Sequence, residues 1–371
     1  MRLAQASANV SATREPRPWK EPSHRQYSHC APIPITLRRV DAARFDLIAP
    51  PDFKVSTLLE DARRGLQGRP RSIPPKHFYD AAGSALFDEI CGLPEYYLTR
   101  AEGALLEVSA RDIAARSSAS ELVELGSGMA RKTGLLLRAM SMTAPSLVYV
   151  PFDISATALE ASAEALLTVH PSLFVRAVVG DFPADLGRLS RVPRAAGAKR
   201  LFAFLGSTMG NLDEAEAPAL VRAVARQMQP GDHFLLGVDL VKSDAVLHAA
   251  YNDARGVTAA FNKNVLAVMN RELGADFDLS KWDHVAHYRR DAARIEMHLV
   301  SREAQRVSVA RLELALDFVA GERILTEISR KFTRPSVEST LGGGGMKLEA
   351  WYTDEAATFG LALARVSPSS P

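Results

Sequence analysis

The stretch Leu122-Val-Glu-Leu-Gly-Ser-Gly128 joins a short apolar run to two glycines that flank a serine. This pattern is typical of a buried strand that ends in a tight turn and leads into a helix. Gly126 lets the backbone turn sharply, and Gly128 lets a ligand approach the main chain without meeting a Cβ atom. A dinucleotide-binding loop would have a third glycine at position 131, but Arg131 stands there, so pyrophosphate binding is disfavoured.

Apolar runs of the same kind recur along the chain and alternate with amphipathic segments, the clearest of which spans 214–228. Alternation of this type predicts an α/β fold with a doubly wound, mostly parallel, Rossmann-like sheet. Its ligand site should lie at the carboxyl ends of the strands. The candidate strands are 122–125, 147–152, 174–179, 201–205 and 234–240.

Composition excludes several classes of protein. The 371 residues are 47% hydrophobic and 24% charged, ordinary values for a globular protein with a sizeable core. No apolar run approaches the roughly 18–20 residues that span a bilayer, so no membrane association is expected. Cys30 and Cys91 are too few for a disulfide framework or the usual cysteine-rich metal site, and we expect no metal. A reducing, cytoplasmic location fits this composition.

The net charge of +2 conceals an uneven distribution. Residues 1–40 contain seven Lys or Arg and two Glu, a balance of +5, so residues 41–371 sum to −3. The folded part is therefore slightly acidic, and charge gives no indication of a nucleic-acid partner. Residues 1–40 are rich in Pro, Ser and Arg and lack the apolar segment of a secretory signal, so we expect a disordered basic extension. A transit peptide or a short basic arm is the alternative.

Acidic residues follow the next two predicted strands, in register with the glycine loop. Asp153 is placed to accept hydrogen bonds from the two ribose hydroxyls of an adenosine. Asp181 can accept from the adenine amino group, and Phe182 can pack on the ring. Class I methyltransferases that bind S-adenosylmethionine show this order, which favours that cofactor over a nicotinamide. Lys132, in the helix after the glycine loop, is included among the expected cofactor-binding residues.

Each of these residues also has a purely structural explanation. Gly126 and Gly128 are ordinary in strand-to-helix turns, Asp153 could cap the following Ala-rich helix, and Asp181 could be a turn residue. Their joint occurrence at consecutive strand ends favours the cofactor site.

Longer motifs across the chain are more specific. They are Lys76-His-Phe-Tyr-Asp-Ala-Ala-Gly-Ser-Ala-Leu-Phe-Asp88, Leu93-Pro-Glu-Tyr-Tyr97, Phe204-Leu-Gly-Ser-Thr-Met-Gly-Asn-Leu212, Gly237-Val-Asp-Leu-Val-Lys242, Ala250-Tyr-Asn-Asp253, Thr258-Ala-Ala-Phe-Asn262, Ile295-Glu-Met-His-Leu299 and Thr326-Glu-Ile-Ser329. With them the chain, from about residue 55 to 366, resembles the L-histidine Nα-methyltransferases that begin ergothioneine biosynthesis. Residues 1–40 have no counterpart in that family, and Leu98 and the segment 129–131 depart from its pattern in detail.

The resemblance implies a class I methyltransferase domain formed by 106–241 with 336–371, and an α+β substrate-binding domain formed by 41–105 with 242–335. It implies a monomeric enzyme that uses S-adenosylmethionine to trimethylate the α-amino group of L-histidine. The reaction would pass through the mono- and dimethyl intermediates to hercynine.

The resemblance also implies roles for individual residues around the substrate. Asn211 and Tyr251, with Tyr96 nearby, are expected to hold the carboxylate. Tyr79 and the main chain around Gly206 are expected near the amine, where Tyr79 would orient it; no general base is assigned.

The imidazole is expected between Glu327 and Ser329, which lie two residues apart and so share one face of a strand. Met297 is expected to wall the same site. A carboxylate that accepts from one ring nitrogen and a hydroxyl that serves the other would discriminate against most other amino acids.

Other interpretations remain open. The tyrosines could be core aromatics and Glu327 a surface charge, while His77 and His298 are expected to be structural and Lys242 and Lys331 to be solvated. The functional alternatives are methylation of another amino acid or a histidine derivative, and a non-catalytic ligand-binding protein with the same fold.

Overall fold

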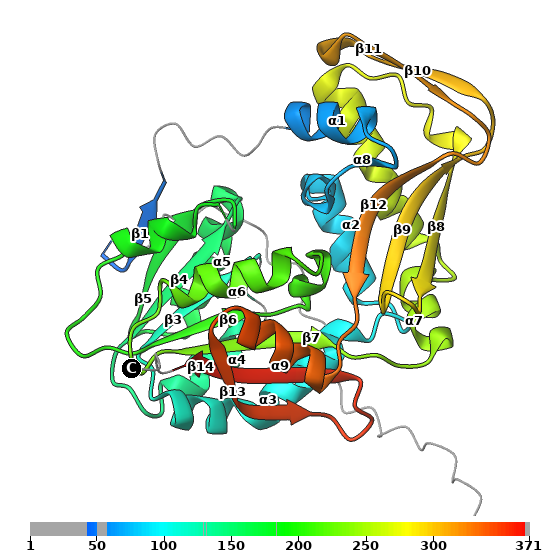
Figure 1. Ribbon diagram of the computed structural model, residues 1–371. Coiled ribbons are helices and arrows are strands. Elements are labelled where there is room, and N and C mark those ends of the chain that lie inside the picture. Colours follow the sequence, from blue (N-terminus) through cyan, green and yellow to red (C-terminus); the bar gives the residue numbers. More distant parts are fainter. Residues whose placement is uncertain (1–42, 50–57, 129, 131, 183, 368–371) are drawn as a thin grey trace, which may run out of the picture. The chain divides into compact units, whose positions relative to one another are not determined.

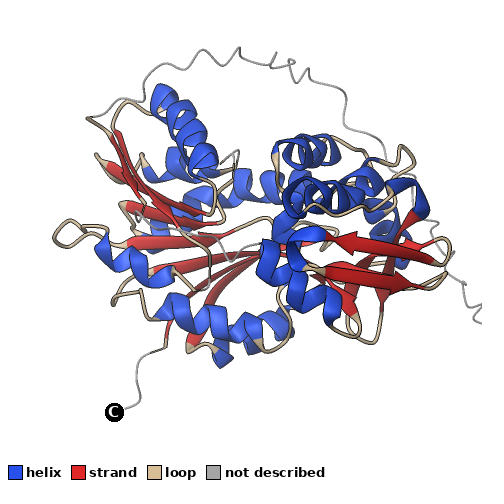
Figure 2. Cartoon of the chain, turned by 90° about the horizontal axis from the view of Figure 1, so that it is seen from above, coloured by secondary structure: helices blue, strands red, loops and turns tan. Residues whose placement is uncertain are grey.

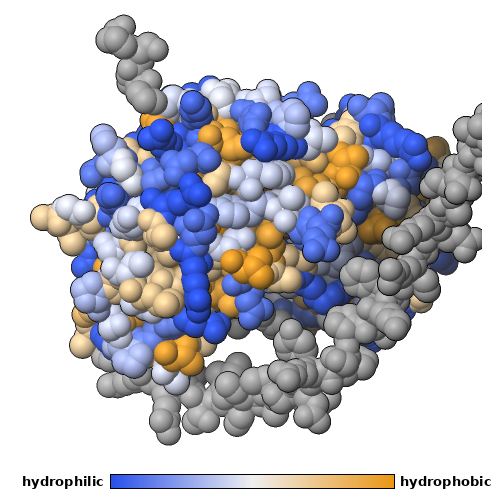
Figure 3. All heavy atoms as spheres, turned by 90° about the horizontal axis from the view of Figure 1, so that it is seen from below, coloured by the Kyte–Doolittle hydropathy of each residue, from blue (hydrophilic) through white to orange (hydrophobic). Residues whose placement is uncertain are grey.

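The computed structural model describes residues 43–49, 58–128, 130, 132–182 and 184–367. The expected disordered extension, residues 1–40, lies outside these ranges. Within them, no helix is long and apolar enough to cross a membrane. Hydrophilic and hydrophobic side chains are interspersed on the face seen in Figure 3. Strongly exposed apolar side chains include Val108, Met142 and Val169.

An eight-stranded sheet forms one part of the fold, in the order β1-β5-β4-β3-β6-β7-β14-β13 (Figure 1). All neighbouring pairs are parallel except those of β14, which is antiparallel to both β7 and β13. The predicted doubly wound, mostly parallel α/β sheet is confirmed. The strands are β1 (Phe45–Ile48), β3 (Glu121–Leu125), β4 (Leu147–Asp153), β5 (Leu173–Val179), β6 (Arg200–Phe204), β7 (His233–Asp239), β13 (Met346–Thr353) and β14 (Phe359–Val366).

Both faces of this sheet are covered by helices, which explains why its strands are continuous apolar runs. Along β3, Leu122 belongs to the core formed with α3, α4 and α5, whereas Val123 belongs to the core formed with α6 and α9. Figure 2 shows helices on either side of the strands. The helices are α3 (Leu98–Ser117), α4 (Thr133–Met140), α5 (Ala156–Val169), α6 (Glu216–Ala225) and α9 (Arg334–Gly343).

The order of strands reverses between β3 and β6, where the chain leaves β3 for β4 on one side and later returns to β6 on the other. In open α/β sheets, ligands bind outside the carboxyl ends of the strands at such a switch point. The glycine loop, Asp153 and Asp181 all follow strands at this edge.

A second, four-stranded sheet has the order β2-β12-β9-β8 and a core of its own, which includes Phe78, Phe261 and Trp282. Its strands are β2 (Arg71–Ser72), β8 (Trp282–Arg289), β9 (Arg294–Ser301) and β12 (Arg323–Arg330). The helices α1 (Leu58–Gln67), α2 (Ala81–Cys91), α7 (Asp244–Tyr251) and α8 (Val257–Leu273) contribute to this core, as does Leu98 at the start of α3. The remaining elements are the hairpin β10 (Gln305–Val309) and β11 (Leu314–Phe318), and the 3₁₀ turns η1 (Pro75–Phe78), η2 (Leu186–Arg191), η3 (Thr208–Asn211), η4 (Leu279–Lys281) and η5 (Ala310–Leu312).

Two elements from the range 41–105 lie with the larger sheet. Strand β1 pairs with β5, and α3 places Leu105 and Leu106 in the core beside β3. The proposed division into domains stays a prediction.

The two sheets meet at the end of β7, beside Phe332, which lies two residues after the end of β12. Phe332 N donates to Asp239 O at 2.8 Å, and Val241 N donates to Phe332 O at 2.9 Å. Leu240 and Phe332 thereby form an isolated parallel bridge. Residues at the end of β12 are thus held beside the carboxyl end of β7.

Candidate functional site

The glycine loop folds back on β4 through left-handed backbone conformations. Gly126 has φ of +65° and Gly128 of +47°, a region that glycine enters without steric cost. Gly126 N donates to Phe152 O at 2.8 Å. A Cβ atom on Gly126 would lie 3.4 Å from the ring of Phe182, so Phe182 packs directly over this turn. Two expected cofactor residues from separate loops are therefore in contact.

Asp153 ties the first two loops together. Its Oδ2 accepts from Gly128 N, and its Oδ1 accepts from Ser155 N, each at 3.0 Å. A carboxylate oxygen has more than one lone-pair direction, so both oxygens retain capacity for ribose hydroxyls.

Asp181 and its neighbours form a row of charges. Asp181 Oδ2 lies 3.4 Å from Lys76 Nζ, which in turn lies 3.0 Å from Asp61 Oδ2. His77 Nε2 lies 2.9 Å from the same Asp61 oxygen, which fits the structural role expected for His77. Burial, partly offset by Asp61, lowers the pKa of His77.

Lys132 forms an ion pair with Glu102, a fully buried residue of α3 that sequence reasoning missed. Glu102 also accepts from Gly206 N, at 2.8 and 2.9 Å. The helical spacing of the sequence could have revealed that Glu102 is buried, since it lies three residues before Leu105 and four before Leu106 and so shares their apolar face. A charge on the apolar face of a helix indicates a buried partner.

The loop residues suit a nucleoside cofactor. Ser127 Oγ is buried and makes no hydrogen bond to any residue that the structure describes. A Cβ atom on Gly128 would face open space. An unpaired hydroxyl, an open main chain, the acceptor Asp153 and the aromatic Phe182 match the chemistry of S-adenosylmethionine.

The expected substrate residues Tyr251 and Ser329 are in direct contact. Tyr251 OH lies 2.8 Å from Ser329 Oγ, and Lys331 Nζ donates to both oxygens at 2.9 Å. Lys331 is fully buried and forms an ion pair of 2.8 Å with the equally buried Asp239. The expectation that Lys331 is solvated was wrong, because β12 ends against β7 and places the side chain in the interior.

Asp239 also forms hydrogen bonds with Tyr97 and Lys242. Tyr97 OH donates to its two oxygens at 2.8 Å, and Lys242 Nζ lies 2.5 Å from Oδ1. Lys242 was also wrongly expected to be solvated, since its side chain is only 9% exposed. Burial opposes the charge on Lys331, but Asp239 and Tyr251 outweigh it and raise the pKa of this lysine. Lys331 is therefore a permanent buried cation.

Glu327 and Ser329 share a face because they lie two residues apart on β12, and a β-bulge just before Glu327 decides which face that is. Leu325 pairs with His298 and Glu327 with Met297, so Thr326 is the extra residue. The Thr326 hydroxyl lies 2.7 Å from Asn262 Oδ1 and 3.0 Å from Met297 O, which holds the bulge in place.

No residue in the described ranges forms a hydrogen bond or ion pair with the Glu327 carboxylate. Burial raises its pKa to about 7, and the positive charge of Lys331 limits the rise. A half-buried carboxylate without a partner suits an incoming N–H donor.

An aromatic cluster connects the three expected tyrosines. Phe87 lies between Tyr79 and Tyr96, with ring centroids 5.6 and 6.3 Å away, and Tyr96 contacts Tyr251 at 6.5 Å. Burial raises the pKa of all three tyrosines, and the charge of Glu327 adds to the rise. Tyr79 nevertheless keeps 47% of its surface exposed, so it can meet a ligand.

The turn η3, which ends at Asn211, lies against the end of β12. A Cβ atom on Gly210 would lie 2.9 Å from Arg330 O and 3.6 Å from Ser329 Oγ, so only glycine permits this approach. Gly206, at the start of the same loop, has φ of +75°. A Cβ atom on Gly206 would lie 3.8 Å from Lys132 Nζ, so Lys132 lies close to this loop. Met297 is buried in the core of the smaller sheet, opposite Glu327.

One family description, histidine-specific methyltransferase, SAM-dependent, matches residues 58–366. The chain belongs to this family. The resemblance drawn from the motifs is confirmed, together with the methyltransferase class and S-adenosylmethionine as cofactor. The roles of individual residues stay predictions.

Curated relatives of this methyltransferase agree with the family. The histidine N-alpha-methyltransferase of Mycolicibacterium smegmatis is 48% identical over 313 residues, which cover 84% of this chain and 96% of that protein. The protein of the same name from Mycobacterium tuberculosis is 48% identical over 83% of this chain and 94% of its own length. Ergothioneine biosynthesis protein 1 of Schizosaccharomyces pombe is 28% identical over 77% of this chain and 38% of its own length.

Replacing Asp153 with Ala should weaken binding of S-adenosylhomocysteine about 10- to 100-fold, because hydrogen bonds to a charged acceptor are lost. Calorimetric titration measures the change. Glu160→Ala, which removes an exposed carboxylate of α5, is the control, and equal affinities in the two variants would contradict the assignment of Asp153.

Replacing Glu327 with Gln should stabilise the ligand-free protein at pH 8. The folded-state pKa of about 7 exceeds the ordinary 4.5, so this group favours folding below pH 4.5 and loses that contribution as the pH rises through 7. The free energy of unfolding at pH 8 should rise by roughly 1–3 kcal/mol, measured by urea denaturation.

Glu322→Gln is the matched control for this measurement. Burial alone would raise the pKa of Glu322, but hydrogen bonds from Arg71 and from the main chain of Val319, together with nearby arginine charges, outweigh it and lower the pKa. That variant should therefore lose stability at pH 8. A loss of stability in Glu327→Gln as well would show that the carboxylate has a partner.

Replacing Lys331 with Met should cost about 3–5 kcal/mol of stability, because Asp239 loses its buried partner. The double variant Lys331→Met with Asp239→Asn should recover part of that stability. It should still bind histidine poorly in the presence of S-adenosylhomocysteine, since Tyr251 and Ser329 lose their common donor. Wild-type histidine affinity in the double variant would contradict a positioning role for Lys331.

Proposed function

We propose that this protein transfers methyl groups from S-adenosylmethionine to the α-amino group of L-histidine, three times in succession, to give hercynine in the first step of ergothioneine biosynthesis. The observation that carries the proposal is the pair Glu327 and Ser329, on one face of β12 beside Tyr251. Family membership and relatives named for this reaction support it.

The imidazole would lie between Glu327 and Ser329. The unpaired carboxylate would accept a ring N–H, which also supplies the partner that the half-buried Glu327 lacks. Such a charge-assisted hydrogen bond contributes roughly 1.5–3 kcal/mol. An amino acid with an apolar side chain would leave Glu327 desolvated and unpaired, so it would be rejected.

Lys331 prepares both hydroxyls to act as donors. It occupies one lone pair of Tyr251 OH and one of Ser329 Oγ, so each hydroxyl proton points elsewhere. One proton serves the hydrogen bond between the two hydroxyls, and the other is left for the ligand. The substrate carboxylate would meet Asn211 and Tyr251, with Tyr96 alongside and the charge of Lys331 behind them.

Bound S-adenosylmethionine would supply an electrophilic methyl group, which the amine lone pair attacks while S-adenosylhomocysteine leaves. The protein's task is then to align a neutral amine and to exclude water. Gly126, Gly128, Lys132, Asp153, Asp181 and Phe182 would hold the cofactor.

Tyr79 and the main chain at Gly206 would orient the amine. As methyl groups accumulate, N–H donors are lost and a fixed positive charge remains. Tyrosine faces such as those of Tyr79 and Tyr96 stabilise that charge by cation–π contact, so the mono- and dimethyl intermediates can bind in the same place. These residues would form the whole site within one chain, so the reaction as proposed needs no second subunit.

Incubation with S-adenosylmethionine and L-histidine should give products heavier by one, two and three methyl groups, detected by mass spectrometry. Tryptophan is the control amino acid, because its indole cannot satisfy both Glu327 and Ser329. No mass gain on histidine, or equal turnover of tryptophan, would overturn the proposal.

A further inference from the structure

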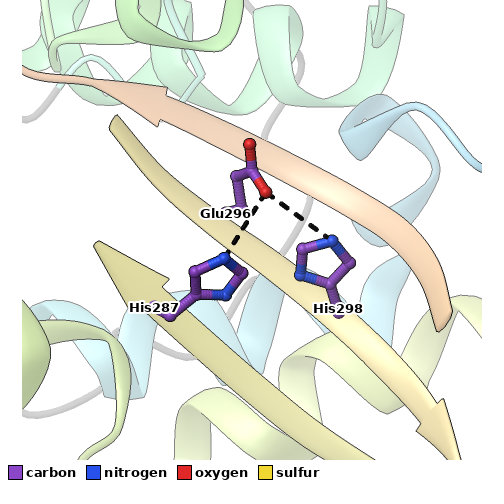
Figure 4. Close-up of side chains that lie close together, drawn as sticks. All are labelled: His287, Glu296 and His298. Atoms are coloured by element: carbon purple, nitrogen blue, oxygen red, sulfur yellow. Dashed lines mark ion pairs between the residues drawn. The ribbon is translucent and has the colours of Figure 1, made fainter. Parts of the chain in front are cut away.

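Two histidines and a glutamate gather on the smaller sheet, away from the residues assigned to methyl transfer. His287 lies on β8, and Glu296 and His298 lie on β9. Figure 4 shows both imidazole rings turning a nitrogen toward the Glu296 carboxylate. One ligand atom from each residue lies within 4.8 Å of the other two.

The strand register brings these three residues together. Residues two apart on a strand share a face, which places Glu296 and His298 side by side. His287 is directly opposite Glu296 across the antiparallel pair. Met297, between the two β9 ligands, points to the other face and into the core. This cluster could not be predicted from the sequence, because His287 lies nine residues before Glu296 and no motif marks the pairing of the two strands.

The distances within the cluster suit ligation better than hydrogen bonding. His287 Nε2 lies 3.6 Å and His298 Nε2 3.8 Å from Glu296 Oε2. Both separations are too long for a hydrogen bond. Zinc binds nitrogen and oxygen ligands at about 2.0–2.2 Å, which leaves tetrahedral ligand atoms roughly 3.3–3.5 Å apart. A small adjustment of side chains would therefore admit an ion.

The surroundings leave these donor atoms available. Arg294 donates to Glu296 Oε1, at 2.8 Å from Nε, which orients the carboxylate and leaves Oε2 facing the two histidines. The Nδ1 atoms of His287 and His298 are buried and have no hydrogen-bond partner within the described part of the chain.

We propose that His287, Glu296 and His298 form a binding site for a divalent transition-metal ion, with Zn²⁺ the preferred occupant. Two imidazoles and one carboxylate are a ligand set that zinc uses in proteins, with water in the remaining position. The ion would join β8 to β9 on the face opposite Met297. It has no part in the methyl transfer proposed above.

Three arginines limit the affinity. Arg294 and Arg289 face Glu296, the latter with Nη1 at 3.6 Å from Oε1, and the charge of Arg323 acts on His298. Their repulsion opposes a further cation. Arg289→Met, which removes a charge but keeps the hydrogen bond that orients Glu296, should therefore bind Zn²⁺ more tightly than the unaltered chain.

Titration of the full, tag-free and metal-free chain with Zn²⁺ tests the proposal. Calorimetry should find one saturable site per chain, and Co²⁺ in the same site should give the strong visible absorption of a four- or five-coordinate ion. His287→Ala should weaken binding at least tenfold. His287 is 35% exposed, so this change should leave the fold intact, which circular dichroism checks.

His248→Ala is the matched control, because His248 lies exposed on α7, outside the cluster. It should bind Zn²⁺ like the unaltered chain. Absence of a saturable site, or equal affinities in His287→Ala and His248→Ala, would overturn the proposal. Histidine methylation should be unchanged in His287→Ala, so failure of the metal site and failure of the proposed function give different results.

Discussion

The buried ion pair between Asp239 and Lys331 is the contact on which the arrangement of the site depends. Asp239 ends β7 of the larger sheet, and Lys331 follows β12 of the smaller one. Two buried charges are tolerated only when each is fully partnered, which the surrounding hydrogen bonds achieve. Because Lys331 also donates to Tyr251 and Ser329, the contact that joins the sheets also orients the expected substrate ligands.

A second constraint comes from the loop after β6. Ser207 has φ of +57°, an unfavourable conformation for a residue with a side chain, and its Oγ accepts from Asp239 N at 2.9 Å. Gly206, just before it, donates to Glu102, which also pairs with Lys132. One strained loop thus links the cofactor side of the site to the buried ion pair. Backbone strain at this point indicates that geometry is maintained here at a cost in stability.

The fold was predictable because strands that are buried on both faces are continuous apolar runs in the sequence, and Gly, Pro or Asp marks where these runs end. Expected site residues from distant motifs, such as Tyr251 and Ser329, do lie together. The sequence did not reveal Lys331, because a lysine next to Arg330 at a strand end looks solvated until β7 is placed against it. Likewise, the bulge at Thr326 decides which face Glu327 occupies, and it depends on Asn262, 64 residues away.

The central claim is that histidine is recognised at both ends, by Glu327 and Ser329 at the ring and by Asn211 and Tyr251 at the carboxylate. A crystal structure with L-histidine and S-adenosylhomocysteine tests it most directly. The account predicts a ring nitrogen within hydrogen-bond distance of Glu327, and the α-amine facing the cofactor sulfur near Tyr79. An imidazole bound away from Glu327, or a carboxylate in its place, would contradict the account.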